Sequence, residues 1–432
     1  MISEILLTGI ITISLLIFFF LLKLQIGFSL LIVGFCGIWY LKSYKAASLI
    51  LVSSAYNTVS NFVLISVPLF ILMGHLSLTA GLAQKAYSAG FKIVGGLPGG
   101  LGMASSLGCG LFAAATGSSA ATAATLGKVA VPEMEKYGYN SGFACAAVAG
   151  GGSIGILIPP SIVLIIYGMI TDLSIGKLLI AGIIPGILTI LANMLVNLIS
   201  ATLDPKLAPR GDKTDIKTKI KSLNGLWGFI FLIFMVLGGI YAGIATPTEA
   251  AAIGALGAFV LALPNIMKEP KKLIDALVET SVTTSMIFII IVGASIFTMF
   301  LSLANIPNSL TDSVINLELD RMYILILVLL LYIPLGMFLG PIEIMLMLIT
   351  LPIVYPVLID LGFDGIWIGI LLVKMMEIGY VTPPLGFNVF VIHGMNPHVP
   401  LSEIFKQSTR FIAADIFIVI LLILFPFLVY YN

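Results

Sequence analysis

Small hydroxyl residues and glycines gather in two segments of the first half of this chain. The segments read Ala115-Thr116-Gly117-Ser118-Ser119 and Gly150-Gly151-Gly152-Ser153-Ile154-Gly155. Glycine lets backbone approach closely, and hydroxyl and carbonyl oxygens are the ligands that a hard cation such as sodium prefers. The residues predicted to form a first sodium site are Thr116, Ser118, Ser119, Gly152, Ser153 and Gly155.

The second half carries corresponding segments, which predict a second sodium site. The turn reads Gly336-Met337-Phe338-Leu339-Gly340-Pro341. Lys374 stands three residues before Glu377, so the two side chains can meet on one helical face, and an internal ion pair is the alternative to a binding role. The residues predicted for the second sodium site are Gly336, Gly340, Glu377, Gly379 and Thr382.

Two proline pairs lie beside these groups. Gly155 to Pro160 reads GILIPP, and Gly379 to Pro384, 224 positions later, reads GYVTPP. Paired prolines remove backbone donors and open a helix, and paired broken helices in corresponding halves are typical of secondary transporters. A simple kink is the alternative for either copy taken alone.

The half-helices that restart after the proline pairs favour an anion near their amino termini. The residues predicted to bind an anionic substrate are Ser119, Pro160, Ser161, Lys374, Pro384 and Asn388. A structural role is the alternative for each of them, because Ser and Thr also bond between membrane helices and glycine lets helices pack closely.

Composition places the chain in a membrane, since 59% of its 432 residues are hydrophobic and 9% are charged. Cys36, Cys109 and Cys145 lack metal-ligand spacing, and no paired Asp, no Ser with His and no phosphate-binding loop is found. We therefore expect no enzyme activity, no cofactor, no metal other than sodium as coupling ion, and no nucleic-acid partner. Thr246-Pro247-Thr248-Glu249 predicts a capping box.

The apolar stretches predict an all-α polytopic membrane protein with five crossings in each half. Each half also contains a re-entrant hairpin, at 97–131 and 322–357, and a broken helix. Five crossings invert the second half relative to the first, which gives two inverted-topology repeats. The predicted crossings are 5–22, 25–41, 57–78, 140–170 and 178–201, then 225–241, 248–263, 281–303, 365–393 and 404–430.

Lysine and arginine placement predicts the orientation. With the amino terminus outside, most basic residues, including the cluster 206–221, fall on the cytoplasmic side, which satisfies the positive-inside rule. The segments 42–55 and 269–279 precede matching crossings and mix polar with apolar residues. They predict helices lying flat on the membrane as a brace, with ordinary loops as the alternative.

Several long motifs, in the same order, resemble the large membrane subunit of TRAP transporters over essentially the whole chain. They are Gly117 to Gly127 (GSSAATAATLG), Gly155 to Ser161 with Tyr167-Gly168, Thr246 to Ala252 (TPTEAAA) and Glu377 to Asn388 (EIGYVTPPLGFN).

The resemblance implies a tripartite system, in which a small four-helix membrane subunit and a periplasmic substrate-binding protein work with this chain in the bacterial inner membrane. It implies sodium-coupled import of an organic acid, such as a C4-dicarboxylate or sialic acid, by an elevator motion. The scaffold is expected at 1–88 and 204–308, with a cytoplasmic linker at 204–222, and the transport domain at 89–203 and 309–432. A self-sufficient sodium/carboxylate symporter of related fold is the alternative.

Overall fold

The structure is a computed structural model that describes residues 22–316, 319–340 and 354–430, together with Ile342 and part of segment 9–19. The predicted crossing 5–22 and the second arm of the second hairpin lie largely outside these residues. Within the described part every regular element is a helix, so the predicted all-α polytopic class is confirmed.

The first half of the chain forms two groups of helices. The elements before the first hairpin are α2 (Ile26–Leu41), α3 (Tyr44–Val59), η1 (Phe62–Ile65), α4 (Ser66–Thr79) and α5 (Leu82–Val94). Those that follow are α6 (Gly100–Thr116), α7 (Ser119–Lys136), α8 (Ser141–Ser153), η2 (Ile154–Ile156), α9 (Ile162–Thr171), α10 (Ile175–Ala181) and α11 (Ile183–Leu203).

The second half begins with a nearly continuous helical stretch. It consists of α12 (Ile216–Leu223), η3 (Asn224–Leu226), α13 (Trp227–Ile233), η4 (Phe234–Gly238) and α14 (Gly239–Tyr241). The remaining elements are α15 (Pro247–Lys268), α16 (Lys271–Leu303), α17 (Ile306–Ile315), α18 (Arg321–Phe338), α20 (Tyr355–Asp360), α21 (Gly365–Val381), α22 (Phe387–Met395), α23 (Leu401–Leu424) and η6 (Pro426–Leu428).

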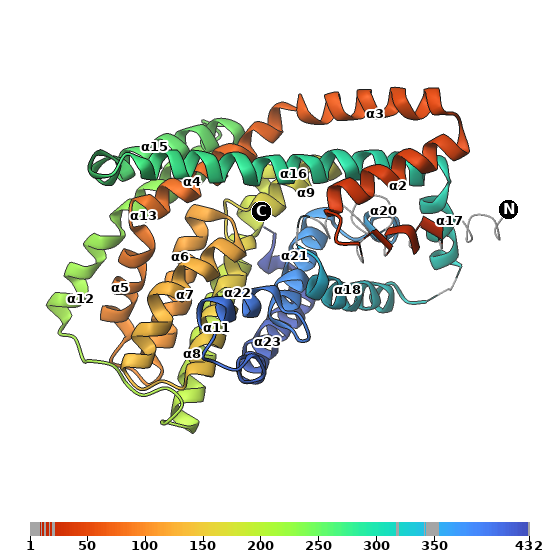
Figure 1. Ribbon diagram of the computed structural model, residues 1–432. Helices are drawn as coiled ribbons and strands as arrows, with labels where there is room; N and C mark the ends of the chain where they lie inside the picture. Colours follow the sequence, from red (N-terminus) through yellow and green to blue (C-terminus); the bar gives the residue numbers. More distant parts are fainter. Residues whose placement is uncertain are drawn as a thin grey trace.

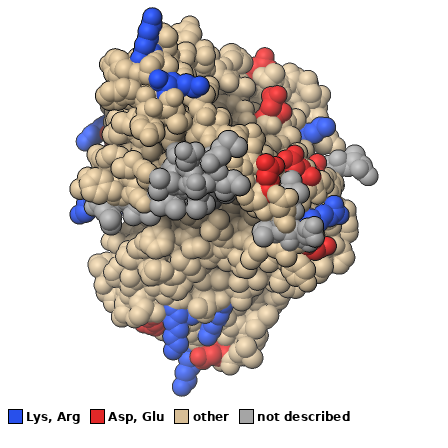
Figure 2. Space-filling model, turned by 90° about the vertical axis from the view of Figure 1, so that its right-hand side faces the viewer, with Lys and Arg blue, Asp and Glu red and all other residues tan. Residues whose placement is uncertain are grey.

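Among the described residues, seven helical stretches are long and apolar enough to cross a membrane: Phe62–Thr79, Ile175–Leu203, Ile216–Tyr241, Pro247–Lys268, Lys271–Leu303, Arg321–Phe338 and Leu401–Leu424. Many of their exposed residues are large and apolar, such as Ile187, Leu191 and Leu195. Most of the surface in Figure 2 is neither acidic nor basic, and charged residues gather at its upper and lower edges and in a patch on one side. Such a surface suits a hydrocarbon surrounding.

Figure 1 shows α16 lying along one edge of the molecule, beside α2, α4 and α15. The hairpin helices α6 and α7 pack with α8, α11 and α5 in a second group.

The Thr246 capping box at the start of α15 is confirmed, because the Thr246 hydroxyl accepts from the Glu249 amide and the Glu249 carboxylate accepts from the Thr246 amide.

Several elements differ from the sequence prediction, and one of them is the unpredicted helix α17 between α16 and α18. The segment 269–279 does not form a separate helix on the membrane; its residues from Lys271 onward are the first turns of α16, which runs without interruption to Leu303. No glycine or proline stands between Lys271 and Gly293 to end the first turns. Helix α5 was not predicted; it begins after Gly81, which adopts a left-handed conformation and ends α4.

Candidate functional site

Both predicted helix breaks are present. Helix α8 ends at Ser153 and α9 restarts at Ile162, while α21 ends at Val381 and α22 restarts at Phe387. The peptide bonds within both proline pairs are cis. Ser161 supports the first restart, because its hydroxyl accepts from the Leu164 amide at 3.2 Å and donates to the Ile156 carbonyl.

The tip of the first hairpin packs directly against the first break. Gly117 joins α6 to α7 in a left-handed conformation with φ of 59°. A Cβ atom at this position would lie 2.3 Å from the Pro160 carbonyl oxygen. Glycine is therefore needed at the tip for both its conformation and its clearance.

Glycine also allows the broken helix to approach the hairpin closely in each half. A Cβ on Gly155 would lie 2.6 Å from the Ser118 carbonyl oxygen and 2.8 Å from Ser119 Cα. In the second half, a Cβ on Gly379 would lie 2.6 Å from Gly336 Cα. Of the residues predicted for the two sodium sites, the structure thus brings Gly155 against Ser118 and Ser119, and Gly379 against Gly336, backbone against backbone.

Hydroxyl groups surround the first tip. The Thr116 hydroxyl lies 3.1 Å from the Thr122 hydroxyl, which also donates to the Ser118 carbonyl at 2.7 Å. Thr122 is fully buried and was not among the predicted residues, although it stands in the same Ser/Thr-rich segment. In the second half the Thr382 hydroxyl donates to the Ile378 carbonyl at 2.5 Å.

Asn388 connects the two halves of the chain. Its side-chain Nδ2 donates to the Ser119 hydroxyl at 2.8 Å and contacts the Ala149 carbonyl at 3.3 Å. The Ser119 hydroxyl lies 3.2 Å from Asn388 Oδ1. The start of α22 is therefore tied to the tip of the first hairpin and to α8.

A cavity of about 360 Å³ lies beside this tip. Its walls come from the tip residues 116–121, from α4 and α16, and from Ile156, Ile162 and Tyr380. Of the predicted site residues, Thr116, Ser118 and Ser119 line it. The other predicted site residues that the structure describes are not among its lining residues; they are Gly152, Ser153, Gly155, Pro160, Ser161, Gly336, Gly340, Lys374, Glu377, Gly379, Thr382, Pro384 and Asn388.

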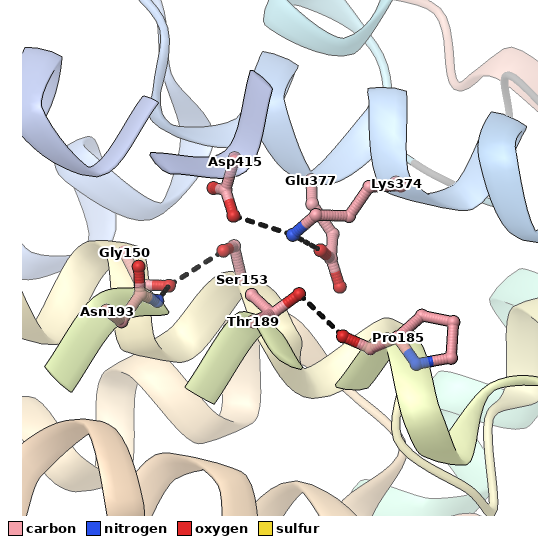
Figure 3. A network of polar contacts seen from close by, with 8 residues as sticks. All are labelled: Gly150, Ser153, Pro185, Thr189, Asn193, Lys374, Glu377 and Asp415. Carbon is pink, nitrogen blue, oxygen red and sulfur yellow. Dashed lines mark hydrogen bonds and ion pairs between the residues drawn. The ribbon is translucent and has the colours of Figure 1, made fainter. Parts of the chain in front are cut away.

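Lys374 lies in an ionic cluster inside the protein (Figure 3). Its ammonium is 2.6 Å from Glu377 Oε2 and 2.6 Å from Asp415 Oδ1, and all three side chains are fully buried. The structure therefore shows the internal ion pair that the sequence left open as the alternative to a binding role for Lys374 and Glu377. Asp415 was missed, although an acidic residue within the apolar stretch 404–430 was a signal that could have found it.

Polar side chains of α11 support α8 next to this cluster. Asn193 donates to the Gly150 carbonyl at 3.2 Å, and the predicted site residue Ser153 donates to the same carbonyl at 2.8 Å (Figure 3). Asn197 donates to the Ser106 hydroxyl of the hairpin at 3.3 Å. Sequence reasoning missed Asn193 and Asn197, whose spacing of four residues places them on one face of an apolar helix.

A hairpin that contacts a broken helix through its backbone, inside a multi-pass helical protein, is typical of secondary transporters. The fold and the site therefore place the chain in this class of membrane transport proteins. The family model described as "Tripartite ATP-independent periplasmic transporter, DctM component" matches residues 13–428, and the chain belongs to this family. Membership in a transporter family agrees with the expectation of no enzyme activity.

The comparisons with individual proteins agree with this assignment. The chain is 36% identical over 342 residues to the C4-dicarboxylate TRAP transporter large permease protein DctM of Pseudomonas aeruginosa, covering 78% of each protein. It is 30% identical over 338 residues to the sialic acid TRAP transporter large permease protein SiaM of Vibrio cholerae, covering 77% of this chain and 78% of the relative. The crystal structure of the Alcanivorax borkumensis YdaH transporter superposes with a TM-score of 0.60 at 14% identity over 88% of each chain, which shows a shared fold.

Proposed function

We propose that this chain, as a large TRAP permease subunit, couples the import of an organic acid to the entry of sodium. The observation that supports this most directly is the backbone contact between hairpin and broken helix, at the hairpin tip for Gly155 and at Gly336 of the hairpin helix α18 for Gly379. The last carbonyls of a helix that stops inside the membrane lack intrahelical partners. Sodium bound between tip and break would satisfy such oxygens and hold the two segments together.

The anionic substrate would bind next to these ions. The cavity beside Ser118 and Ser119 has room for a small organic acid, and α9 and α22 begin close to the same tip. Their amino termini favour a carboxylate. The named relatives carry C4-dicarboxylates and sialic acid, which are carboxylates, so we assign a substrate of this class.

Transport would proceed by alternating access. The cavity is lined on one side by α4 and α16, assigned to the scaffold 1–88 and 204–308, and on the other by the hairpin, assigned to the transport domain 89–203 and 309–432. A loaded transport domain slides along the scaffold. Sodium and substrate drive this step only if they prefer one conformation, because equal affinity for all conformations shifts no population.

The proposed transporter contains two further proteins besides this chain. We assign a small four-helix membrane subunit and a periplasmic binding protein as partners, in a bacterial inner membrane with a periplasmic amino terminus and a cytoplasmic segment 204–222. The basic residues of that segment support this orientation.

Uptake by proteoliposomes containing all three components tests the proposal. Radiolabelled organic acid should accumulate only with an inward sodium gradient, and Ser118→Ala should raise the sodium concentration needed for half-maximal uptake. Equal uptake with potassium in place of sodium would reject sodium coupling. Equal uptake without the binding protein would favour the self-sufficient symporter.

A further inference from the structure

A basic groove lies between α5 and α12, away from the site described above. It has a volume of about 660 Å³, and its charged lining residues are Lys85, Lys92 and Lys221. Gln84, Ser88 and Ser222 add neutral hydrogen-bonding groups to the same lining. Among the described residues, no acidic side chain lines this groove, so the lysines give it a net positive charge.

The three lysines converge because of helix geometry. Lys85 and Lys92 are seven residues apart, or two turns, and therefore share one face of α5. Lys221 comes from α12, which packs against α5. Among the ion pairs formed by the described residues, none involves any of these three ammonium groups.

The acidic groups nearby have other partners or face another hollow. Asp215 occupies the N-cap position of α12, and the nearby Thr218 at the edge of the groove lowers the pKa of its carboxyl. Asp275 and Glu279 line a neighbouring hollow that shares Gln84 and Lys85 with the groove, and Glu279 contacts His75 there at 3.0 Å. The three lysines of the groove are therefore available to bind an anion.

The outward face of α12 shows where this groove lies in the membrane. Ile216, Ile220 and Leu223 are spaced by four and three residues and are 76%, 62% and 48% exposed. The same apolar ridge continues through Trp227 into the membrane-crossing stretch Ile216–Tyr241. Trp favours the level of the lipid headgroups, so the lysines stand where headgroups end and water begins.

We propose that this groove binds the headgroup of an anionic phospholipid. The ammonium groups contact the phosphate, and the exposed apolar residues that follow Trp227 in the same membrane-crossing stretch, Ile230 and Phe234, pack against the acyl chains. A free anion has no such apolar contact, and salt screens its attraction to exposed lysines. Basic pockets between helices at the cytoplasmic surface are a known setting for anionic headgroups.

Native mass spectrometry of the full-length chain in mild detergent tests this inference. Phosphatidylglycerol should bind more tightly than phosphatidylcholine with the same acyl chains. Each lysine near a lipid headgroup contributes about a fivefold gain in affinity, so the triple variant Lys85→Gln, Lys92→Gln, Lys221→Gln should lose roughly a hundredfold.

A matched variant controls for total charge. Lys128→Gln, Lys268→Gln and Lys406→Gln remove three exposed lysines outside the groove and should leave phosphatidylglycerol binding within about threefold. Arginine at positions 85, 92 and 221 should preserve binding. Melting temperature without added lipid shows that each variant is folded.

Three results would overturn the inference. Equal losses of phosphatidylglycerol affinity in the two triple glutamine variants would show that total charge, and not the groove, determines binding. Equal affinity for phosphatidylcholine would remove the role of the anionic headgroup. Displacement of phosphatidylglycerol by millimolar inorganic phosphate would make the groove a site for free anions.

Discussion

The buried ionic cluster predicts a large effect for Lys374→Met. Methionine keeps the length of the side chain but removes the ammonium that contacts both Glu377 and Asp415 at 2.6 Å. Removing one partner of a buried ion pair costs about 3–5 kcal/mol, and we expect the upper part of this range because two fully buried carboxylates lose one shared partner. Such a loss is a large share of the ~5–15 kcal/mol stability of a typical protein.

Thermal unfolding of the purified full-length chain, followed by intrinsic fluorescence, measures this effect. Lys374→Met should lower the melting temperature by roughly 5–10 °C for a chain of this size. The control is a triple variant, Lys374→Met, Glu377→Met, Asp415→Leu, which removes the charges together and should recover at least half of the loss, because an apolar replacement of a whole buried ionic group is often tolerated. An unchanged melting temperature for the single variant would refute this account of the cluster.

Three further substitutions test the site and the fold. Gly155→Ala places a Cβ 2.6 Å from the Ser118 carbonyl oxygen and should reduce proteoliposome uptake about tenfold or more. The control variant Gly394→Ala, whose Cβ would have nothing within 4 Å, should transport normally. Equal uptake by the two variants would contradict the tip contact. Asn388→Ala removes the bonds to Ser119 and to α8, so hydrogen exchange at the hairpin tip should become faster by a factor that corresponds to about 1–3 kcal/mol, and unchanged protection would argue against the connection. Thr246→Ala removes the cap of α15 and should destabilise the chain by about 0.5–2 kcal/mol, which a melting curve detects.

The parts of the site that were predictable depend on residues close together in the sequence. A proline pair removes backbone donors wherever it occurs, and its repetition in both halves favoured breaks over kinks, so the breaks at Pro160 and Pro384 were predictable without the tertiary structure. The pairing of Lys374 with Glu377 follows from their spacing in the same way. Glycine between hydroxyl residues likewise marked the tip at Gly117.

The parts that were missed depend on contacts between distant segments. Asp415 lies 41 residues from Lys374, and Asn388 lies 269 residues from Ser119, so no local pattern relates these partners to each other. The uninterrupted course of α16 was also missed, because a polar start followed by an apolar run reads equally well as two helices. Helix α5 was missed because its apolar face, packed on α6, alternates with the lysines of the groove.

Under the proposed sodium coupling, the two kinds of contact near the breaks have different roles. Lys374, Glu377 and Asp415 join α21 to α23 through short ionic contacts in a fully buried position, so the helix that leads to the second break is held firmly. At the break itself, Gly379 meets Gly336 through backbone alone, without a side chain that could strengthen the contact. A contact of this kind contributes little free energy by itself. An ion that binds the facing oxygens can therefore strongly change the fraction of molecules in which the contact is formed. For this reason we expect sodium to control the hairpin tips, while the ionic cluster keeps the helices behind them fixed.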